Sequence, residues 1–202
     1  MSLYSLLDPL TIIQTLGLIG VILIVFAESG LFFGFFLPGD SLLFTAGFLA
    51  SQGILPIWAL LIGCSVAAII GDSVGYSFGR KTGPMIFTRE DSFFFKKAYI
   101  EKARNFYNKY GKKTIIIARF MPIIRTFAPI VAGVGGMDYK IFIKYNIIGG
   151  LFWSFSMIGA GYILGNTIPN AENYLTIIII GIIIASLLPA IVEFLKNRRL
   201  NL

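Results

Sequence analysis

The sequence predicts an all-α integral membrane protein that forms a single domain over residues 1–202. Hydrophobic residues make up 56% of the chain and charged residues only 13%, with a mean hydropathy of +0.82. Soluble domains carry about 25% charged residues. At about 20 residues per span, the length accommodates about four transmembrane helices, and no stretch between the apolar blocks is long enough for a separate soluble domain.

The first third of the chain contains one ordinary span and one broken one. The run over residues 11–29 is long enough to cross a bilayer. The next two apolar runs, LFFGFFL and LLFTAGFLA, are seven and nine residues long and are separated by PGD. Pro38 cannot continue a helix, and Gly39 eases a chain reversal. Neither run spans alone, so residues 31–52 are predicted to form a re-entrant hairpin.

The region 113–136 repeats this pattern. Its apolar runs are broken at Pro122 and again at Pro129, which predicts a second re-entrant hairpin. Its FMP followed by AG is similar to the FLP followed by AG of the first hairpin. Two hairpins that enter from opposite faces form an inverted repeat, the architecture in which transporter sites lie near the bilayer midplane at the ends of broken helices.

Three further spans are expected over residues 57–78, 141–164 and 175–195. The first of these carries glycines at four-residue spacing, which allow a neighbouring helix to approach closely. They are Gly71, Gly75, Gly79 and Gly83.

Basic residues cluster in the segment 80–113, which holds ten of the 17, and at the end of the chain. By the positive-inside rule, this segment and the C-terminus are predicted to be cytoplasmic. Within it, aromatic residues at helical spacing alternate with lysines after Asp91, which predicts an amphipathic helix. That helix either lies flat at the membrane interface or packs on the protein's own cytoplasmic side. Anionic lipid head groups, rather than nucleic acid, are the expected partner of this charge.

The residues that are missing exclude several kinds of chemistry. The chain has no histidine, so an imidazole zinc site and a Ser-His or Cys-His nucleophile are excluded. No metal site, cofactor or catalytic residue is expected, and the protein is not expected to be an enzyme. The single Cys64 cannot form an internal disulfide and lies in an apolar run, where packing is its expected role. Any proton that the protein moves must be carried by a carboxylate.

Four charged residues lie next to the most apolar, proline-broken segments: Glu28, Asp40, Arg119 and Arg125. Each charge at the bilayer centre costs about 2.5 to 3.5 kcal/mol on insertion scales, so these side chains must be paired, hydrated or used. Arginine stays charged and presents a planar fork that binds phosphate through two parallel hydrogen bonds. Arg119 and Arg125 are therefore candidate ligands of a phosphate head group, and Glu28 and Asp40 are candidate proton carriers.

Three blocks of the chain resemble the DedA family of bacterial inner-membrane proteins. They are ESGLFFGFFLPGDSLLFTAG from Glu28, GDSVGYSFGRKTG from Gly71, and ARFMPIIRTFAPIVAGVGGM from Ala118. This family shares the SNARE-associated or VTT domain with lipid scramblases of the eukaryotic endoplasmic reticulum. The resemblance implies opposed re-entrant hairpins and a multi-pass location in the inner membrane. It also implies movement of phospholipids or polyprenyl phosphates, in many members coupled to the proton motive force. It places an essential acidic pair at Glu28 and Asp40 and an essential arginine pair at Arg119 and Arg125.

The expected function is therefore a flippase for a phosphate-bearing lipid, such as undecaprenyl phosphate or phosphatidylethanolamine. A non-transporting assembly or membrane-homeostasis factor, a passive scramblase and a purely structural ion-pair network remain alternatives, and a homo-oligomer stays open. Asp72 is expected to anchor its span through Arg80, with proton coupling as its second role. Trp58 and Trp153 are expected in interface belts or on lipid-facing surfaces.

Overall fold

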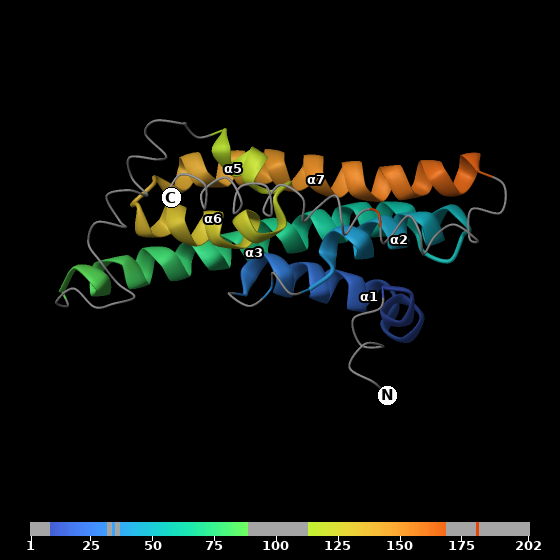
Figure 1. Ribbon diagram of the computed structural model, residues 1–202, viewed down its shortest axis with the longest axis horizontal. Coiled ribbons are helices and arrows are strands. Elements are labelled where there is room, and N and C mark those ends of the chain that lie inside the picture. Colours follow the sequence, from blue (N-terminus) through green and yellow to red (C-terminus); the bar gives the residue numbers. More distant parts are fainter. Residues whose placement is uncertain (1–8, 32–33, 35–36, 89–112, 169–180, 182–202) are drawn as a thin grey trace, which may run out of the picture.

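The computed structural model describes residues 9–31, 34, 37–88, 113–168 and 181 (Figure 1). This part of the chain is helical and contains no strand, so the all-α prediction is confirmed for it. Three of its helices are long and apolar enough to cross a membrane, namely α1, residues Ile57–Gly83 of α3, and α7. The predicted amphipathic helix and the last predicted span lie outside the described residues. The helices are α1 (Pro9–Gly30), α2 (Gly39–Ser51), α3 (Ile57–Thr88), α5 (Thr114–Ala118), α6 (Pro122–Val134) and α7 (Tyr139–Thr167).

The first span is confirmed as a helix but is broken near its beginning. Gly17 has φ 58° and ψ −152°, a conformation outside the helix that glycine adopts because it lacks a Cβ. The segment 18–30 that follows rises about 20 Å at 1.5 Å per residue. That length is less than the hydrocarbon thickness of a bilayer, about 30 Å.

One arm of the first predicted hairpin is a helix, and the other arm is described at three residues only. The break at Pro38 is confirmed, because α2 begins at Gly39. Of the run LFFGFFL, the described residues Leu31, Gly34 and Leu37 lie outside α-helices. The chain turns back on the end of α1 at Gly34, where a Cβ would lie 2.6 Å from the carbonyl oxygen of Ala27. The helix that reverses against α2 is therefore the last part of α1.

The second broken region contains one break of the two predicted. Pro122 occupies the first turn of α6, where its missing N–H costs no helical hydrogen bond, and Met121 before it is extended. The predicted break at Pro129 is wrong, because α6 continues through it to Val134. Pro129 packs against α3, where its Cβ lies 3.6 Å from the Cβ position of Gly75. Membrane helices tolerate proline where neighbouring helices support the freed backbone groups.

The two short helices pack on the two long ones. α2 packs mainly against α7 and α6 against α3, and in Figure 1 α2 and α6 start near the centre of the molecule and run toward opposite ends. Glycines permit both contacts. A Cβ on Gly79 would overlap the carbonyl oxygen of Ile130 in α6, and one on Gly47 would overlap that of Ile158 in α7.

The predicted role of the α3 glycines is confirmed. A Cβ on Gly71 would lie 2.8 Å from the Cβ of Ser29 in α1, and one on Gly83 would lie 3.3 Å from the Cα of Val134 in α6. The glycine series therefore brings α3 close to two helices in turn. Large apolar side chains also cover outward faces of the long helices, as expected for lipid contact. They include Ile19, Leu23, Trp58, Ile62, Phe152 and Ile163.

Candidate functional site

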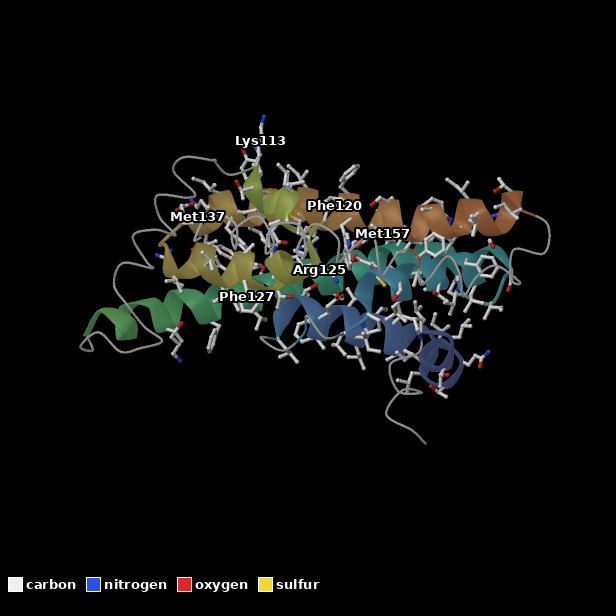
Figure 2. The ribbon with its side chains drawn as sticks, in the orientation of Figure 1. Lys113, Phe120, Arg125, Phe127, Met137 and Met157 are labelled. Atoms are coloured by element: carbon white, nitrogen blue, oxygen red, sulfur yellow. The ribbon has the colours of Figure 1, made fainter. Side chains whose placement is uncertain are left out.

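The charged residues predicted from the sequence lie in the interior of the helix bundle. Arg119 and Arg125 are 4% and 7% exposed, and Glu28 is 1% exposed. Glu28 is near the end of α1, Asp40 is in the first turn of α2, and Arg125 is in the first turn of α6. Figure 2 shows Arg125 near the centre of the molecule, between α6 and the lower helices. Three segments distant in sequence are thus brought to one buried site.

Arg125 binds both members of the predicted acidic pair. Its Nη2 forms an ion pair with Oε1 of Glu28, and its Nη1 lies 2.8 Å from Oδ1 of Asp40. Glu28 Oε1 also accepts a hydrogen bond of 3.2 Å from the backbone N–H of Gly39, the first residue of α2. The N-terminal ends of two short helices therefore meet at these side chains. Each end carries partial positive charge, which favours carboxylates and other anions.

Arg119 belongs to a second cluster and does not pair with Glu28 or Asp40. It follows α5 directly and forms an ion pair with Asp72 of α3. Its Nη2 also donates to Oδ1 of Asn146 at 2.6 Å, while Asn146 Nδ2 donates to the carbonyl oxygen of Ile69 at 2.9 Å. Asn146 fixes the position of Arg119 relative to both α3 and α7.

The predicted partner of Asp72 is wrong. Arg80 instead donates through Nη1 to the hydroxyl of Tyr76 at 2.9 Å and to the carbonyl oxygen of Met137 at 3.2 Å. Asp72 and Arg80 are eight positions apart on one helix, a rise of about 12 Å. Asp72 thus supports one of the two candidate phosphate ligands rather than the end of its own span.

Trp153 links the two clusters. This role of Trp153 was not predicted from the sequence. Its indole is 1% exposed and its Nε1 donates to Oδ1 of Asp40 at 2.8 Å. Its ring centroid lies 4.9 Å from Cζ of Arg125 and 5.9 Å from Cζ of Arg119, within cation–π range of both. The predicted lipid-facing position is therefore wrong for Trp153, whereas Trp58, which is 70% exposed, fits it.

A glycine pair on α7 lies beside Arg119 and allows α5 and α3 to approach α7 closely. A Cβ on Gly149 would lie 3.3 Å from the Cα of Ile116, and one on Gly150 would lie 2.8 Å from Cγ1 of Ile69, with Arg119 in ordinary contact with both positions. Asn146, Gly149, Gly150 and Trp153 follow the i, i+3, i+4, i+7 spacing of one helix face. That spacing was a signal in the sequence that one face of this span contributes to the site.

Several buried polar atoms of the described site have no hydrogen-bond partner. They include Oε2 of Glu28 and Nε of Arg125, and also the hydroxyls of Thr126 and Ser154, the residues that follow Arg125 and Trp153. Buried polar groups are normally satisfied, so these atoms are available to water or to a ligand within the site. The two clusters also combine three carboxylates with two guanidinium groups. Ionised together, these groups carry a net charge of −1.

The fold and the site define a helical membrane protein with paired arginines and carboxylates in its interior. Residues 37–163 match the VTT domain family, and the chain belongs to this family, which is also known as the DedA family. It is 47% identical to protein DedA of Escherichia coli K12 over 179 residues, covering 88% of this chain and 81% of that protein.

Two other relatives show how widely the similarity extends. An uncharacterized membrane protein of Mycobacterium leprae is 45% identical over 171 residues, covering 85% of this chain and 76% of that protein. Inner membrane protein YqjA of Escherichia coli K12 is 33% identical over 144 residues, covering 71% of this chain and 66% of that protein. No solved structure matches the chain.

Proposed function

We propose that this protein is a flippase that moves a phosphate-bearing lipid across the bacterial inner membrane, coupled to the proton motive force. Undecaprenyl phosphate and phospholipids such as phosphatidylethanolamine are the proposed substrates. One observation carries the proposal: Arg125 lies buried between Glu28 and Asp40, where the N-terminal ends of α2 and α6 meet. Such a position suits an anion as well as the carboxylates that now occupy it.

The proposed membrane arrangement is an inverted repeat. In it, segment 18–30 with α2 forms one re-entrant hairpin, and α5 with α6 belongs to the other. The packing of the two short helices supports the repeat, because each lies mainly on a different long helix. α2 packs on α7, and α6 packs on α3. The described exposed lysines and arginines lie toward the end of the molecule where α3 finishes and α7 begins, which we assign to the cytoplasm. They are Arg80, Lys81, Lys113, Lys140 and Lys144.

Competition for Arg125 supplies the proposed coupling. A phosphate and a carboxylate cannot both occupy the same edge of one guanidinium. When phosphate binds Arg125, Glu28 loses its ion pair and takes a proton, for which Oε2 is free of protein donors in the described site. When phosphate leaves, Glu28 releases the proton and binds Arg125 again. Arg119, held by Asp72 and Asn146, provides the second cation along the path.

The proposal is tested with purified protein in vesicles. Transbilayer movement of undecaprenyl phosphate, phosphatidylethanolamine and phosphatidylglycerol is compared with and without a proton gradient. Arg125→Lys keeps the charge but loses the fork, so transport is expected to be lost with normal membrane insertion. Lys113→Gln is the matched control, because Lys113 points away from the bundle and is exposed (Figure 2).

Each result decides between named functions. Movement that requires Arg125 but ignores the gradient would indicate a passive scramblase. Retained transport in both Arg125→Lys and Arg119→Lys would refute phosphate binding by the arginine forks. No movement of any of the three lipids by the parent protein would favour a non-transporting assembly or homeostasis factor.

A further inference from the structure

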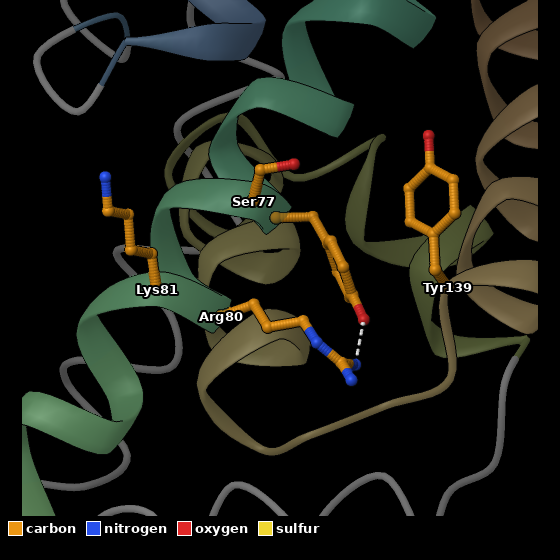
Figure 3. A pocket seen from close by; sticks show the side chains of 5 residues that line it. Ser77, Arg80, Lys81 and Tyr139 are labelled. Carbon is orange, nitrogen blue, oxygen red and sulfur yellow. Dashed lines mark hydrogen bonds between the residues drawn. The ribbon is translucent and has the colours of Figure 1, made fainter.

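A pocket outside the buried site lies at the basic end of α3. It has a volume of about 400 Å³ and opens to the surface, and it is lined by Tyr76, Ser77, Arg80, Lys81 and Tyr139 (Figure 3). None of these residues is acidic, and two are cations. The pocket is separate from the Arg119 and Arg125 clusters, which are buried in the bundle.

Arg80 is held in this pocket by one of its nitrogens. Nη1 donates to the hydroxyl of Tyr76 and to the carbonyl oxygen of Met137, and the hydroxyl of Tyr76 itself donates to that carbonyl. Nε and Nη2 have no acceptor in the described part of the chain. These two nitrogens form the edge through which arginine binds a phosphate with two parallel hydrogen bonds. Among the described residues, the guanidinium is thus oriented by hydrogen bonds but paired with no carboxylate.

Neighbouring groups add to the preference for an anion. Tyr139 stands across the pocket from Arg80, and Lys81 adds a positive charge on the adjoining face of α3, with its ammonium directed away from the guanidinium of Arg80 (Figure 3). Asp138, which precedes Tyr139 in sequence, caps α7 by accepting hydrogen bonds of 2.9 and 3.2 Å from the N–H groups of Lys140 and Ile141. Within the described residues it forms no ion pair with Arg80.

The surface beside the pocket indicates the source of the anion. Ile70, Val74 and Phe78 are exposed on α3 at four-residue spacing, and this apolar stripe ends beside Ser77 and Lys81. A free phosphate ion has no apolar part that could contact this stripe. A phospholipid would place its acyl chain along it and its phosphate in the pocket.

We infer that this pocket is a binding site for the phosphate head group of an anionic phospholipid, with Arg80 as the ligand of the phosphate and Lys81 as a further positive charge at the edge of the pocket. The site does not depend on the proposed transport and serves binding at the membrane surface. Its ligands differ from those of the buried site, so the two can be tested separately.

The test is lipid binding to the purified full chain in detergent, followed by native mass spectrometry with phosphatidylglycerol as the probe. Loss of one charge-assisted contact is expected to weaken binding roughly tenfold. This loss is expected for Arg80→Gln, and a smaller loss is expected for Lys81→Gln. Lys81→Gln serves as the second variant because, in the described structure, Lys81 supports no other residue. Lys113→Gln, exposed at the same end, is expected to bind as the parent does.

Two comparisons identify the ligand and separate the proposals. Phosphatidylcholine, whose phosphate is compensated by a cation, is expected to bind more weakly, and inorganic phosphate is expected not to displace phosphatidylglycerol at equal concentration. Unchanged binding in both pocket variants, or full displacement by inorganic phosphate, would overturn the inference. Arg125→Lys is expected to keep this binding even where transport is lost.

Discussion

The indole N–H of Trp153 donates to Oδ1 of Asp40 over 2.8 Å, although the two residues are 113 positions apart. The same carboxylate oxygen lies 2.8 Å from Nη1 of Arg125, whose Cζ lies 4.9 Å from the centroid of the Trp153 ring. Trp153 therefore contacts both a carboxylate and a guanidinium of the buried site. It fixes the distance between α2, α6 and α7 at the point where a ligand would separate the ion pair.

Trp153→Phe separates the two roles of this side chain. Phenylalanine keeps an aromatic face for Arg125 but has no N–H for Asp40, so the variant is expected to fold normally and transport more slowly. Trp153→Leu loses both contacts and is expected to be the more impaired. The measurements are transport in vesicles and thermal unfolding in detergent. Equal transport by Trp153→Phe and the parent would show that the bond to Asp40 has no part in the cycle.

The ion pair of Asp72 with Arg119 is expected to matter most when only one partner is removed. Asp72→Asn leaves a buried guanidinium without its counter-charge, which costs about 3 to 5 kcal/mol in comparable buried pairs. The double variant Asp72→Asn with Arg119→Gln removes both charges and is expected to recover part of this loss. The free energy of unfolding in mixed detergent measures the effect.

Asp138→Asn is the control for that series. Asp138 is exposed and caps α7, and asparagine caps a helix about as well as aspartate. Its stability is expected to match that of the parent. The double variant could instead lose more free energy of unfolding than Asp72→Asn and Arg119→Gln lose in sum. In that case the pair would not be acting as a buried ion pair.

Close packing of α3 on α6 predicts a strong effect of one added methyl group. A Cβ on Gly79 would overlap the carbonyl oxygen of Ile130. Gly79→Ala must therefore move one helix, and such overpacking costs about 1 to 3 kcal/mol. Gly159→Ala is the matched control, because nothing lies within 4 Å of the added Cβ. Alanine favours a helix over glycine by roughly 0.5 to 1 kcal/mol, so this control is expected to be neutral or slightly more stable.

The inverted arrangement predicts opposite accessibility of the two ends of the bundle. A cysteine at Gln52, exposed where α2 ends, should react with an impermeant maleimide from the periplasm, and one at Lys81 from the cytoplasm. Gly39 is unsuitable for this purpose, because a Cβ there would overlap the carboxylate of Glu28. The parent provides the background, since Cys64 is buried. Reaction of both positions from one side would refute the arrangement.

The sequence predicted which residues form the site better than it predicted how they pair. Charges inside apolar segments are costly wherever they lie, so Glu28, Asp40, Arg119 and Arg125 stood out without any knowledge of packing. The break at Pro38 was equally local, since proline cannot continue a helix. Pairing depends instead on which helices meet.

The errors follow from the same distinction. Asp72 was assigned to Arg80 on its own helix, whereas α7, which packs against both α3 and α5, brings Arg119 to it. Pro129 was expected to break a helix that the contact with α3 keeps intact. Trp153 shares the properties of any membrane tryptophan until the fold places Asp40 beside it.

Proton coupling through Glu28 is tested by Glu28→Gln, which mimics the protonated acid. In the structure Glu28 Oε1 accepts from both Arg125 and Gly39, while Oε2 has no partner among the described residues. A neutral amide can still accept at one oxygen, so the start of α2 keeps its contact, but the amide cannot exchange a proton. Lipid binding is expected to survive and to become largely insensitive to pH. Transport in vesicles is expected to lose its dependence on the proton gradient. Asp40→Asn provides the comparison. The introduced asparagine keeps the contact with Trp153 only if its amide oxygen faces the indole N–H. If both amide variants transport with the pH profile of the parent, the carboxylates are structural, and Asp72 becomes the residue to test for proton exchange.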